Sequence, residues 1–465
     1  MQYIARPKVG FLSAFYGAYD DVMGAGFRPL QTQAAAGNRT VLERHFDVTD
    51  FGVLSSLNEA EAAARKIASA RIEALIYAPT MVAPPEWIEV ALRQVACPIV
   101  VWSATRLQSV SSGLDHRAAT VDTSLVGATM LANCFVRRGQ RFAVVDAVPE
   151  NPADEMRLTR TVNAAVAARR LNTAVALRVG APIAGYRDVE TTAEELNAVG
   201  IREIDVSVAQ WERAFAAVSA RDVEDELAAL RARANWRVTS AATGEASARL
   251  ALALRRLTQE HGATVGTVNC HSCWFRQHDQ IGIVACLGVS LLLEAGISFS
   301  CTGDLPAALA GLLAKALSGS SLYCELYVRE PDTDQFLVAA GGEGDPTWAQ
   351  DGNVDVVANE YYPGRCGAGL GVRFALQRGP ATVISMTPTM QGWRLIWAPG
   401  AIIDRTFPSL DGPNGMFRFA TQPGQRAAEQ WIGAGPTHHA ALARGHLDLE
   451  MPLVATLANL TNIRV

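Results

Sequence analysis

The segment over residues 298–325 (SFSCTGDLPAALAGLLAKALSGSSLYCE) limits the fold of this chain more than any other stretch. A short apolar strand over 297–301 leads into the polar turn Thr302-Gly303-Asp304, and a helix over 306–317 follows. The next predicted strand carries Glu325. Because α/β proteins bind ligands where a strand ends and a helix begins, we expect Asp304 and Glu325 to converge on one site. Two carboxylates in one place can bind a metal ion or transfer protons.

A purely structural interpretation of both residues stays open. Aspartate is a preferred N-cap residue, so Asp304 is also expected to cap the helix that it precedes. Glu325 is then a solvated residue on the surface of its strand. On this interpretation the segment supports the fold and carries no chemistry.

The chain divides into three parts that differ in their pattern of apolar residues. Over residues 1–150, and again over 151–320, apolar strands alternate with helices, which predicts two α/β domains with doubly wound parallel sheets. Over residues 321–465, short apolar runs separated by Gly, Pro and Asp predict a β-rich C-terminal domain. No GxGxxG motif follows the first predicted strand, over 8–16, so nothing favours a dinucleotide site.

The composition excludes several classes of function. With 49% hydrophobic and 19% charged residues, the chain is expected to be a soluble globular protein. A net charge of −5 with mixed signs offers no basic surface for nucleic acid or for an acidic membrane, and no apolar run is long enough to span a bilayer. The eight scattered cysteines do not form a disulfide framework, and the N-terminus does not read as a signal peptide. We therefore expect reduced thiols and a cytoplasmic location.

A pair of histidines, His438 and His439, follows a Gly-Pro-Thr sequence near the C-terminus. Imidazole is a common metal ligand, hydrogen-bond donor and general acid. The small residues around the pair indicate a tight turn, and we expect a helix after it. Surface histidine pairs also occur by chance, so this pair alone does not define a site.

Two further motifs offer polar or thiol ligands. Cys270 and Cys273 flank His271 in a pattern that is compatible with zinc, but no second C-x-x-C pair matches it, and buried thiols at a strand end are the alternative. The glycine-rich stretch PGRCGAGLG lacks the Lys-Ser/Thr of a phosphate loop and is expected to form tight turns, with Arg365 or Arg373 facing a polar ligand. No Gly-x-Ser-x-Gly motif after a strand indicates a serine hydrolase.

Taken in order, these features resemble the L-arabinose isomerase and L-fucose isomerase group, most strongly over residues 281–447. A long apolar helix over 281–295, a strand, a Gly-Asp turn, a helix, a strand with Glu325, a β-rich stretch and Gly-x-x-His-His follow one another there. Residues 1–260 match only as two α/β domains of suitable length. The resemblance implies three domains, a homotrimer or homohexamer with the active site between subunits, and a divalent metal, usually Mn²⁺. It also implies aldose–ketose isomerisation through an ene-diol.

The resemblance implies roles for individual residues as well. Glu325 matches a family carboxylate that binds the metal and acts as acid and base, and Asp304 matches the acid of the turn, as a further catalytic and metal-binding candidate. His439 matches the C-terminal metal histidine. His438, Thr302 and Arg373 are the candidates for substrate binding.

Two positions depart from the family pattern. Thr302 stands where the family carries a glutamate, and a second metal histidine of the family falls near Gly342. A Thr hydroxyl is not ionised at neutral pH and is a poorer ligand than a carboxylate. If the turn is extended, Thr302 and Asp304 point to the same side, which lets Asp304 replace the first ligand. Glu343 is the candidate to replace the second.

Three functions therefore stay open. The first is a metal-dependent isomerase of a sugar or sugar-like polyol with a remodelled site. The second is an enzyme on the same scaffold with lyase, hydrolase or epimerase chemistry on a polyhydroxylated substrate. The third is a metal-free sugar-binding or regulatory relative. The retained Asp304, Glu325 and His439 favour an enzyme, because a pure binding protein has less need of them.

Overall fold

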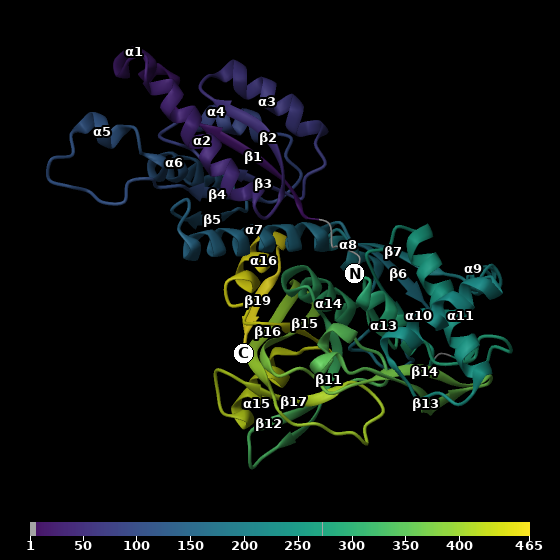
Figure 1. Cartoon of the computed structure of the whole chain (residues 1–465). Helices are drawn as coiled ribbons and strands as arrows, with labels where there is room; N and C mark the ends of the chain where they lie inside the picture. Colours follow the sequence, from purple (N-terminus) through teal and green to yellow (C-terminus); the bar gives the residue numbers. More distant parts are fainter. Residues whose placement is uncertain (1–5, 272) are drawn as a thin grey trace. The chain divides into compact units, whose positions relative to one another are not determined.

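The computed structural model describes residues 6–271 and 273–465, and they form two compact units. The first unit holds the chain up to Arg170 together with Pro452–Ala458, and the second holds Leu171–Met451 and Asn459–Val465. Figure 1 labels the elements of both. The division into three domains at residues 150 and 320 stays a prediction.

The first unit is built on a five-stranded parallel sheet with the strand order β2-β1-β3-β4-β5 (Figure 1). Its strands are β1 (Lys8–Ala14), β2 (Asp47–Leu54), β3 (Ala74–Tyr77), β4 (Ile99–Ser103) and β5 (Ala143–Asp146). Its helices are η1 (Gly17–Tyr19), α1 (Asp20–Met23), α2 (Phe27–Glu43), α3 (Leu57–Ser69), α4 (Pro85–Leu92), α5 (His116–Thr120), α6 (Ser124–Arg137) and most of α7 (Pro152–Asn172). The alternation confirms the expected α/β class. The edge strand β2 was not predicted, because several of its residues are polar and exposed.

The second unit begins with a four-stranded parallel sheet in the order β10-β9-β6-β7. The strands are β6 (Val175–Val179), β7 (Arg202–Val206), β9 (Val265–Val268) and β10 (Ser298–Cys301). The accompanying helices are α8 (Ala193–Ala198), α9 (Val208–Ala216), α10 (Ala220–Arg233), α11 (Ala241–Glu260), α12 (Cys273–Arg276) and α13 (Cys286–Glu294). The long apolar helix expected over 281–295 is wrong in its first turn. Residues 281–285 form a buried loop, because the Ile283 N–H donates to the Ile281 carbonyl, a bond that an α-helix does not make, and Gly282 is packed against the carbonyls of Arg276 and His278.

The β-rich region is an antiparallel barrel in which β15 pairs with both β18 and β16 and so closes the ring β15-β18-β11-β12-β17-β16. Its strands are β11 (Leu322–Glu330), β12 (Gln335–Ala339), β15 (Gly379–Thr389), β16 (Gly392–Ile403), β17 (Asn414–Phe419) and β18 (His439–Arg444), with β19 (Thr461–Arg464) added beside β16. The remaining elements are β8 (Asn235–Trp236), β13 (Asp355–Gly364), β14 (Gly367–Arg373), η2 (Pro346–Trp348), η3 (Gln350–Gly352), α15 (Gly424–Ala434) and α16 (Glu450–Ala458). The β-rich prediction is confirmed, whereas the helix expected after His438 and His439 is the strand β18. Its small apolar residues pack against other strands, where the period of two applies.

Helix α14 (Leu305–Ser318) joins the parallel sheet to the barrel. It contacts β9 and β10 on one side and β15 and β18 on the other, so residues 305–315 are buried on every face. A helix that is apolar all round is expected in such a position. Even Lys315 is buried, with Nζ 2.7 Å from Asp345 Oδ2. The predicted strand, turn, helix and strand of the segment 298–325 are therefore the core of this unit.

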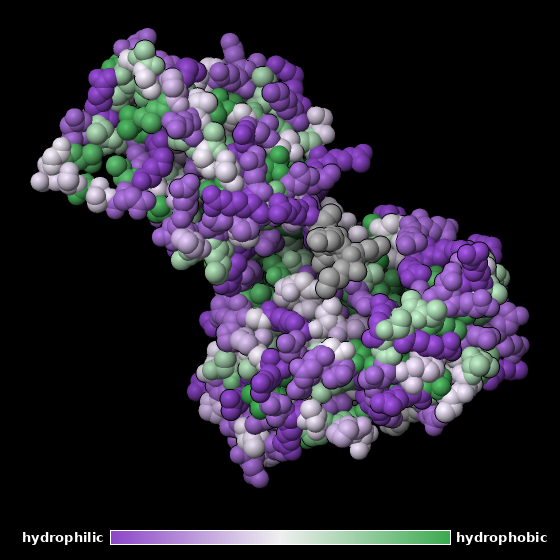
Figure 2. Space-filling view, viewed as in Figure 1, coloured by the Kyte–Doolittle hydropathy of each residue, from purple (hydrophilic) through white to green (hydrophobic). Residues whose placement is uncertain are grey.

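Hydrophilic residues cover most of the surface that Figure 2 shows, with hydrophobic residues scattered singly among them. Scattered exposed apolar residues of this kind are normal for a folded domain. Within the described part of the chain, every helix is too short or too polar to cross a bilayer.

Candidate functional site

A pocket of about 1290 Å³ opens in the second unit beside the carboxyl end of β10. Four of the predicted site residues line it: Thr302, Glu325, His438 and His439. The loop over 183–188 and the loop over 409–412 complete its wall. The structure therefore brings residues that are more than 130 positions apart in the sequence to one cavity.

Glu325 and His439 face each other across neighbouring strands of the barrel. They form one register pair of the antiparallel β11–β18 ladder, and Glu325 Oε1 lies 3.6 Å from His439 Nε2. Directly opposed residues of an antiparallel pair have their side chains close together on one face of the sheet. Backbone pairing, and not a flexible loop, thus sets the separation of these two groups.

Asp304 lies behind His439 and is fully buried. Its Oδ1 accepts a hydrogen bond from the Ala307 N–H at 2.8 Å, and its Oδ2 lies 2.8 Å from His439 Nδ1. The first bond confirms that Asp304 caps helix α14. Since a carboxylate oxygen accepts hydrogen bonds, His439 Nδ1 donates to Asp304, and His439 Nε2 faces Glu325. Both oxygens are engaged, so these contacts favour a positioning role for Asp304 over direct ligation of a metal.

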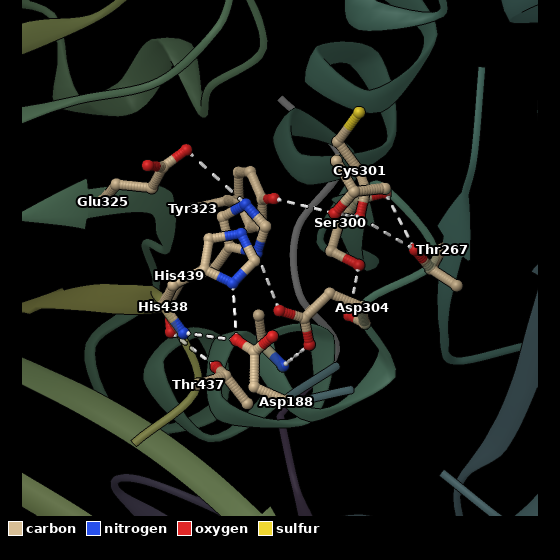
Figure 3. A network of polar contacts seen from close by, with 12 residues as sticks. Asp188, Thr267, Ser300, Cys301, Asp304, Tyr323, Glu325, Thr437, His438 and His439 are labelled. Atoms are coloured by element: carbon tan, nitrogen blue, oxygen red, sulfur yellow. Dashed lines mark hydrogen bonds and ion pairs between the residues drawn. The ribbon is translucent and has the colours of Figure 1, made fainter. Parts of the chain in front are cut away.

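His438 has a carboxylate partner of its own. Asp188, from the loop after β6, accepts from the His438 backbone N–H at 3.0 Å, and its Oδ2 lies 2.5 Å from His438 Nδ1. Partial burial acts to raise the pKa of Asp188, but the hydrogen bonds from His438 outweigh it and hold the pKa below its usual range. The centroids of the two imidazole rings lie 3.8 Å apart, with the ring planes tilted by 40°. In Figure 3 the rings stand between Glu325 on one side and the two aspartates on the other.

Tyr323 contacts both His439 and Thr302. Its ring lies against that of His439 with a centroid separation of 4.6 Å, and its hydroxyl is 3.5 Å from Thr302 Oγ1. Burial raises the pKa of Tyr323 far above its usual range, so the hydroxyl stays protonated. Tyr323 and Glu325 share one face of β11, while Cys324 between them points into the barrel core.

The turn before α14 is not extended, so the condition under which Thr302 and Asp304 would project to the same side is not met. Thr302 has φ of 60° and Gly303 has φ of 84°, which are left-handed conformations. A Cβ on Gly303 would lie 2.5 Å from Pro182 Cα, so this position requires glycine. A β-branched residue with positive φ is an outlier, and such strain is often kept at functional sites.

One oxygen and two nitrogens are grouped suitably for a metal ion. Ligand atoms of Glu325, His438 and His439 all lie within 4.8 Å of one another. Metal-binding histidines commonly donate their second N–H to a carboxylate, which fixes the tautomer, and both histidines have such a partner here. A mixed set of imidazole and carboxylate ligands suits divalent transition ions. The residues therefore fit a divalent metal, and they leave coordination positions open.

Two other candidates lie elsewhere. Arg373 is absent from the described lining of the pocket, and its guanidinium pairs with Asp355 across the β13–β14 hairpin at 2.9 Å. Glu343 is buried beside Cys286, and burial raises its pKa, although the Cys286 hydrogen bond acts in the opposite direction. The charge of His439 acts to lower the pKa of Glu343, but Glu343 does not belong to the group of three ligand residues. The grouping of ligand atoms therefore does not support the hypothesis that Glu343 replaces a lost metal ligand.

The residues grouped around the predicted zinc motif differ from those expected, because Cys301 joins Cys270 and His271. His271 lines the pocket, and its ligand atom groups with the thiols of Cys270 and Cys301. The side chain of Cys273 lies outside the described residues. Arg365 lines a neighbouring cavity together with His271 and Arg276.

Sequence reasoning missed Asp188 and Tyr323. Asp188 follows the carboxyl end of strand β6, which is the usual place for functional loops of a parallel sheet, so its position was a usable signal. Tyr323 lies two residues before Glu325 on a strand, which places both on one face. The partnership of Asp188 with His438 spans 250 positions, and no local pattern indicates it.

Comparisons with known proteins bear on the family of the chain. Residues 322–463 match the L-arabinose isomerase C-terminal domain family. A sulfoquinovose isomerase from Alkalicoccus urumqiensis is 24% identical over 412 residues, which cover 84% of this chain and 86% of the relative. The chain is therefore arabinose isomerase-like, with its described α/β sheets followed by a C-terminal region of that family.

Solved structures add nothing to this assignment. Two ABC transporter solute-binding proteins, from Burkholderia multivorans and Actinobacillus succinogenes, are 13% and 12% identical to this chain. They cover 57% and 60% of it and 80% and 86% of their own chains, and the second holds D-allose. Both TM-scores are 0.17, so neither similarity carries an argument about the fold or the site.

Proposed function

We propose that this chain is a metal-dependent aldose–ketose isomerase that acts on a sugar or sugar-like polyol. The observation that supports this most is the group of Glu325, His438 and His439 in the pocket, with an aspartate behind each imidazole. A sugar-binding protein has no need for two oriented imidazoles beside a carboxylate. The relationship to L-arabinose isomerase and to a sulfoquinovose isomerase agrees with this chemistry.

In this proposal Glu325, His439 and His438 hold the divalent metal, which is Mn²⁺ by the family resemblance. When bound, the metal polarises the sugar oxygens and stabilises the negative charge that develops on them. Asp304 and Asp188 keep the two imidazoles in the tautomer that leaves one nitrogen free for ligation.

Isomerisation requires a proton to leave one carbon and return to its neighbour. Glu325 is half-exposed at the pocket wall and is the carboxylate that we assign to this transfer, as base and then as acid. The accompanying hydroxyl proton moves between the two oxygens of the ene-diol. Thr302 lines the pocket, so we assign to it the binding of the substrate hydroxyls. The protonated hydroxyl of Tyr323 lies 3.5 Å from Thr302 Oγ1 and positions the Thr302 side chain.

The charge of the lining bears on the substrate. Acidic and imidazole groups surround the main pocket, whereas the guanidinium groups of Arg276 and Arg365 line the neighbouring cavity that also includes His271. A sugar with an uncharged reacting end fits the first cavity. If the substrate carries a sulfonate or another anionic group, we expect that group to bind near Arg276 and Arg365. We also infer a cytoplasmic homo-oligomer, a trimer or hexamer, from the family resemblance.

The experiment that tests the proposal uses the full chain, stripped of metal and then reloaded with Mn²⁺. Neutral and sulfonated aldoses and ketoses are incubated in D₂O, and products are identified by NMR. We expect a metal-dependent aldose–ketose pair with solvent deuterium at the carbon next to the carbonyl. An epimer, a shortened product or a hydrolysis product would assign a different reaction to the scaffold. Binding of sugar without turnover under any metal would assign a binding protein.

A further inference from the structure

A cluster of thiols lies next to the proposed active site and takes no part in the proposed reaction. Cys270 follows strand β9, and Cys301 ends the adjacent parallel strand β10. Adjacent parallel strands end at the same edge of a sheet, which brings the two thiols together. The ligand atoms of Cys270, Cys301 and His271 all lie within 4.8 Å of one another.

We propose that Cys270, His271 and Cys301 bind a second, thiophilic metal ion of the zinc class, at a site separate from the Glu325 group. Zinc sits about 2.3 Å from sulfur and about 2.0 Å from imidazole nitrogen, so tetrahedral ligand atoms lie about 3.5 Å apart. The three ligand atoms lie within 4.8 Å of one another, so each separation exceeds this spacing by at most about 1.3 Å.

Two thiols and an imidazole suit zinc better than they suit manganese. Soft thiolate ligands select zinc or copper, whereas carboxylate and water ligands suit manganese. Cys270 and Cys301 are buried, with exposed fractions of 3% and 6%. The Glu325 group offers only oxygen and nitrogen, so the two sites differ in the metal that each prefers.

The alternative is that these thiols merely fill the core, since Cys270, Cys286 and Cys301 all belong to one hydrophobic cluster. An apolar cluster does not need a carboxyl group, yet buried Glu343 bonds to Cys286 and acts on the pKa of all three thiols. The thiols therefore do not lie in a purely apolar environment, which a role in filling the core would provide.

The open side of the cluster faces the cavities. His271 lines both the main pocket and the neighbouring one, so a fourth position next to it is accessible to water. Three protein ligands and a water molecule is the arrangement of catalytic zinc sites, whereas structural sites use four protein ligands. The proposed ion would therefore be exchangeable and would accept an external ligand.

Cobalt titration of the metal-free full chain tests this inference, because cobalt bound to thiolate gives a charge-transfer band in the near ultraviolet. We expect the wild-type protein to show the band and to bind two divalent ions per chain at saturation. Cys270→Ser and Cys301→Ser should lose the band and one ion. His439→Ala should lose the other ion and keep the band. Cys324→Ser, a buried thiol in the barrel core, should keep both.

A cobalt spectrum without the thiolate band in the wild-type protein would overturn the inference, and so would a band that survives both cysteine substitutions. If a serine variant does not fold, X-ray absorption at the zinc edge of the zinc-loaded wild-type chain provides the test. We expect sulfur atoms in the first coordination shell of the zinc ion. A first shell of oxygen and nitrogen alone contradicts the site.

Discussion

Asp304 connects the start of helix α14 to the imidazole of His439, with one carboxylate oxygen on the Ala307 N–H and the other 2.8 Å from His439 Nδ1. One side chain thus ties the geometry of the parallel sheet to that of the barrel. The bond also decides which nitrogen of His439 carries the proton. The sequence left open whether Asp304 is a helix cap or a member of the site, and the structure shows that it caps α14 and also contacts His439.

Asp304→Asn should separate these two tasks. Asparagine still caps a helix through its oxygen, but an amide N–H facing Nδ1 would force the other tautomer on His439 and remove the free Nε2 lone pair. We expect metal affinity to fall by about 10- to 100-fold with little change in unfolding free energy. Isothermal titration with Mn²⁺ measures this. Asp115→Asn, at the N-cap of α5 in the other unit, is the matched control and should leave affinity unchanged.

Glu325→Gln should lower kcat by about a hundredfold or more, because the amide cannot accept the carbon-bound proton. The fold should be retained, since Glu325 is half-exposed and glutamine has the same shape. Glu330→Gln on the same strand, where Glu330 pairs with Arg405, is the control that should retain turnover. Steady-state kinetics under saturating metal make the comparison. Near-normal turnover in the first variant would remove Glu325 from the proton transfer.

His439→Ala should weaken the retention of metal, which elemental analysis after dialysis measures. The reason is the loss of a neutral nitrogen ligand whose orientation Asp304 maintains. His116→Ala, an exposed histidine of α5, serves as the control. Unchanged metal content in His439→Ala would transfer the ligand role to His438 or to another residue.

Thr302→Gly should increase stability and decrease activity. Glycine removes the strain of a β-branched residue at φ of 60°, and we expect a gain of about 1 kcal/mol in unfolding free energy. The loss of the hydroxyl at the pocket wall should raise KM for the sugar. Asp351→Gly, at φ of 53° on the surface, should change stability in the same direction and leave KM unaltered. Unchanged KM in Thr302→Gly would show that Thr302 does not contact the substrate.

Glu343 should make the metal-free protein less stable as pH rises. Burial raises its pKa, so the folded state holds a proton that the unfolded state has released. Its stabilising contribution is complete below the ordinary glutamate pKa and is lost as pH rises through the raised value. The wild-type chain should therefore lose unfolding free energy relative to Glu343→Gln across this window.

Urea unfolding at a series of pH values, with a chelator present, measures that difference. Glu330→Gln is a control of opposite sign, because the Arg405 hydrogen bond lowers the pKa of Glu330. The contribution of Glu330 is present above its ordinary pKa and is lost as pH falls through the lowered value. A difference between wild type and Glu343→Gln that does not vary with pH would mean that Glu343 is not titrating in this range.

The segment 298–325 was predictable because each of its parts has a local signal. Apolar runs define the strands, Asp304 and Pro306 mark the start of the helix, and Gly319 marks its end. Strand β18 was not predictable in the same way, since Ala-Ala-Leu-Ala after His439 suits a helix locally and only pairing with β11 and β15 makes it a strand.

The candidate site was predictable where the residue types are themselves unusual. Adjacent histidines and the carboxylates Asp304 and Glu325 stand out from their surroundings, and all four meet at one place. Asp188 is one exposed acid among many in the sequence, so only the three-dimensional path of the loop after β6 identifies it. The close approach of Gly303 to Pro182, next to the left-handed Thr302, is a tertiary constraint that no turn rule contains.

The pairing of β11 with β18 constrains substitution at Glu325 and His439 more than in the loops that line the same pocket. Glu325 and His439 sit on rungs of a closed barrel, where a shift of one residue would turn each side chain to the opposite face. The loops over 183–188 and 409–412 carry no such constraint, although they wall the same cavity. Libraries aimed at a new substrate should therefore randomise these loops except at Asp188, which contacts His438, and leave the barrel strands unchanged, because the backbone pairing sets the spacing of Glu325 and His439.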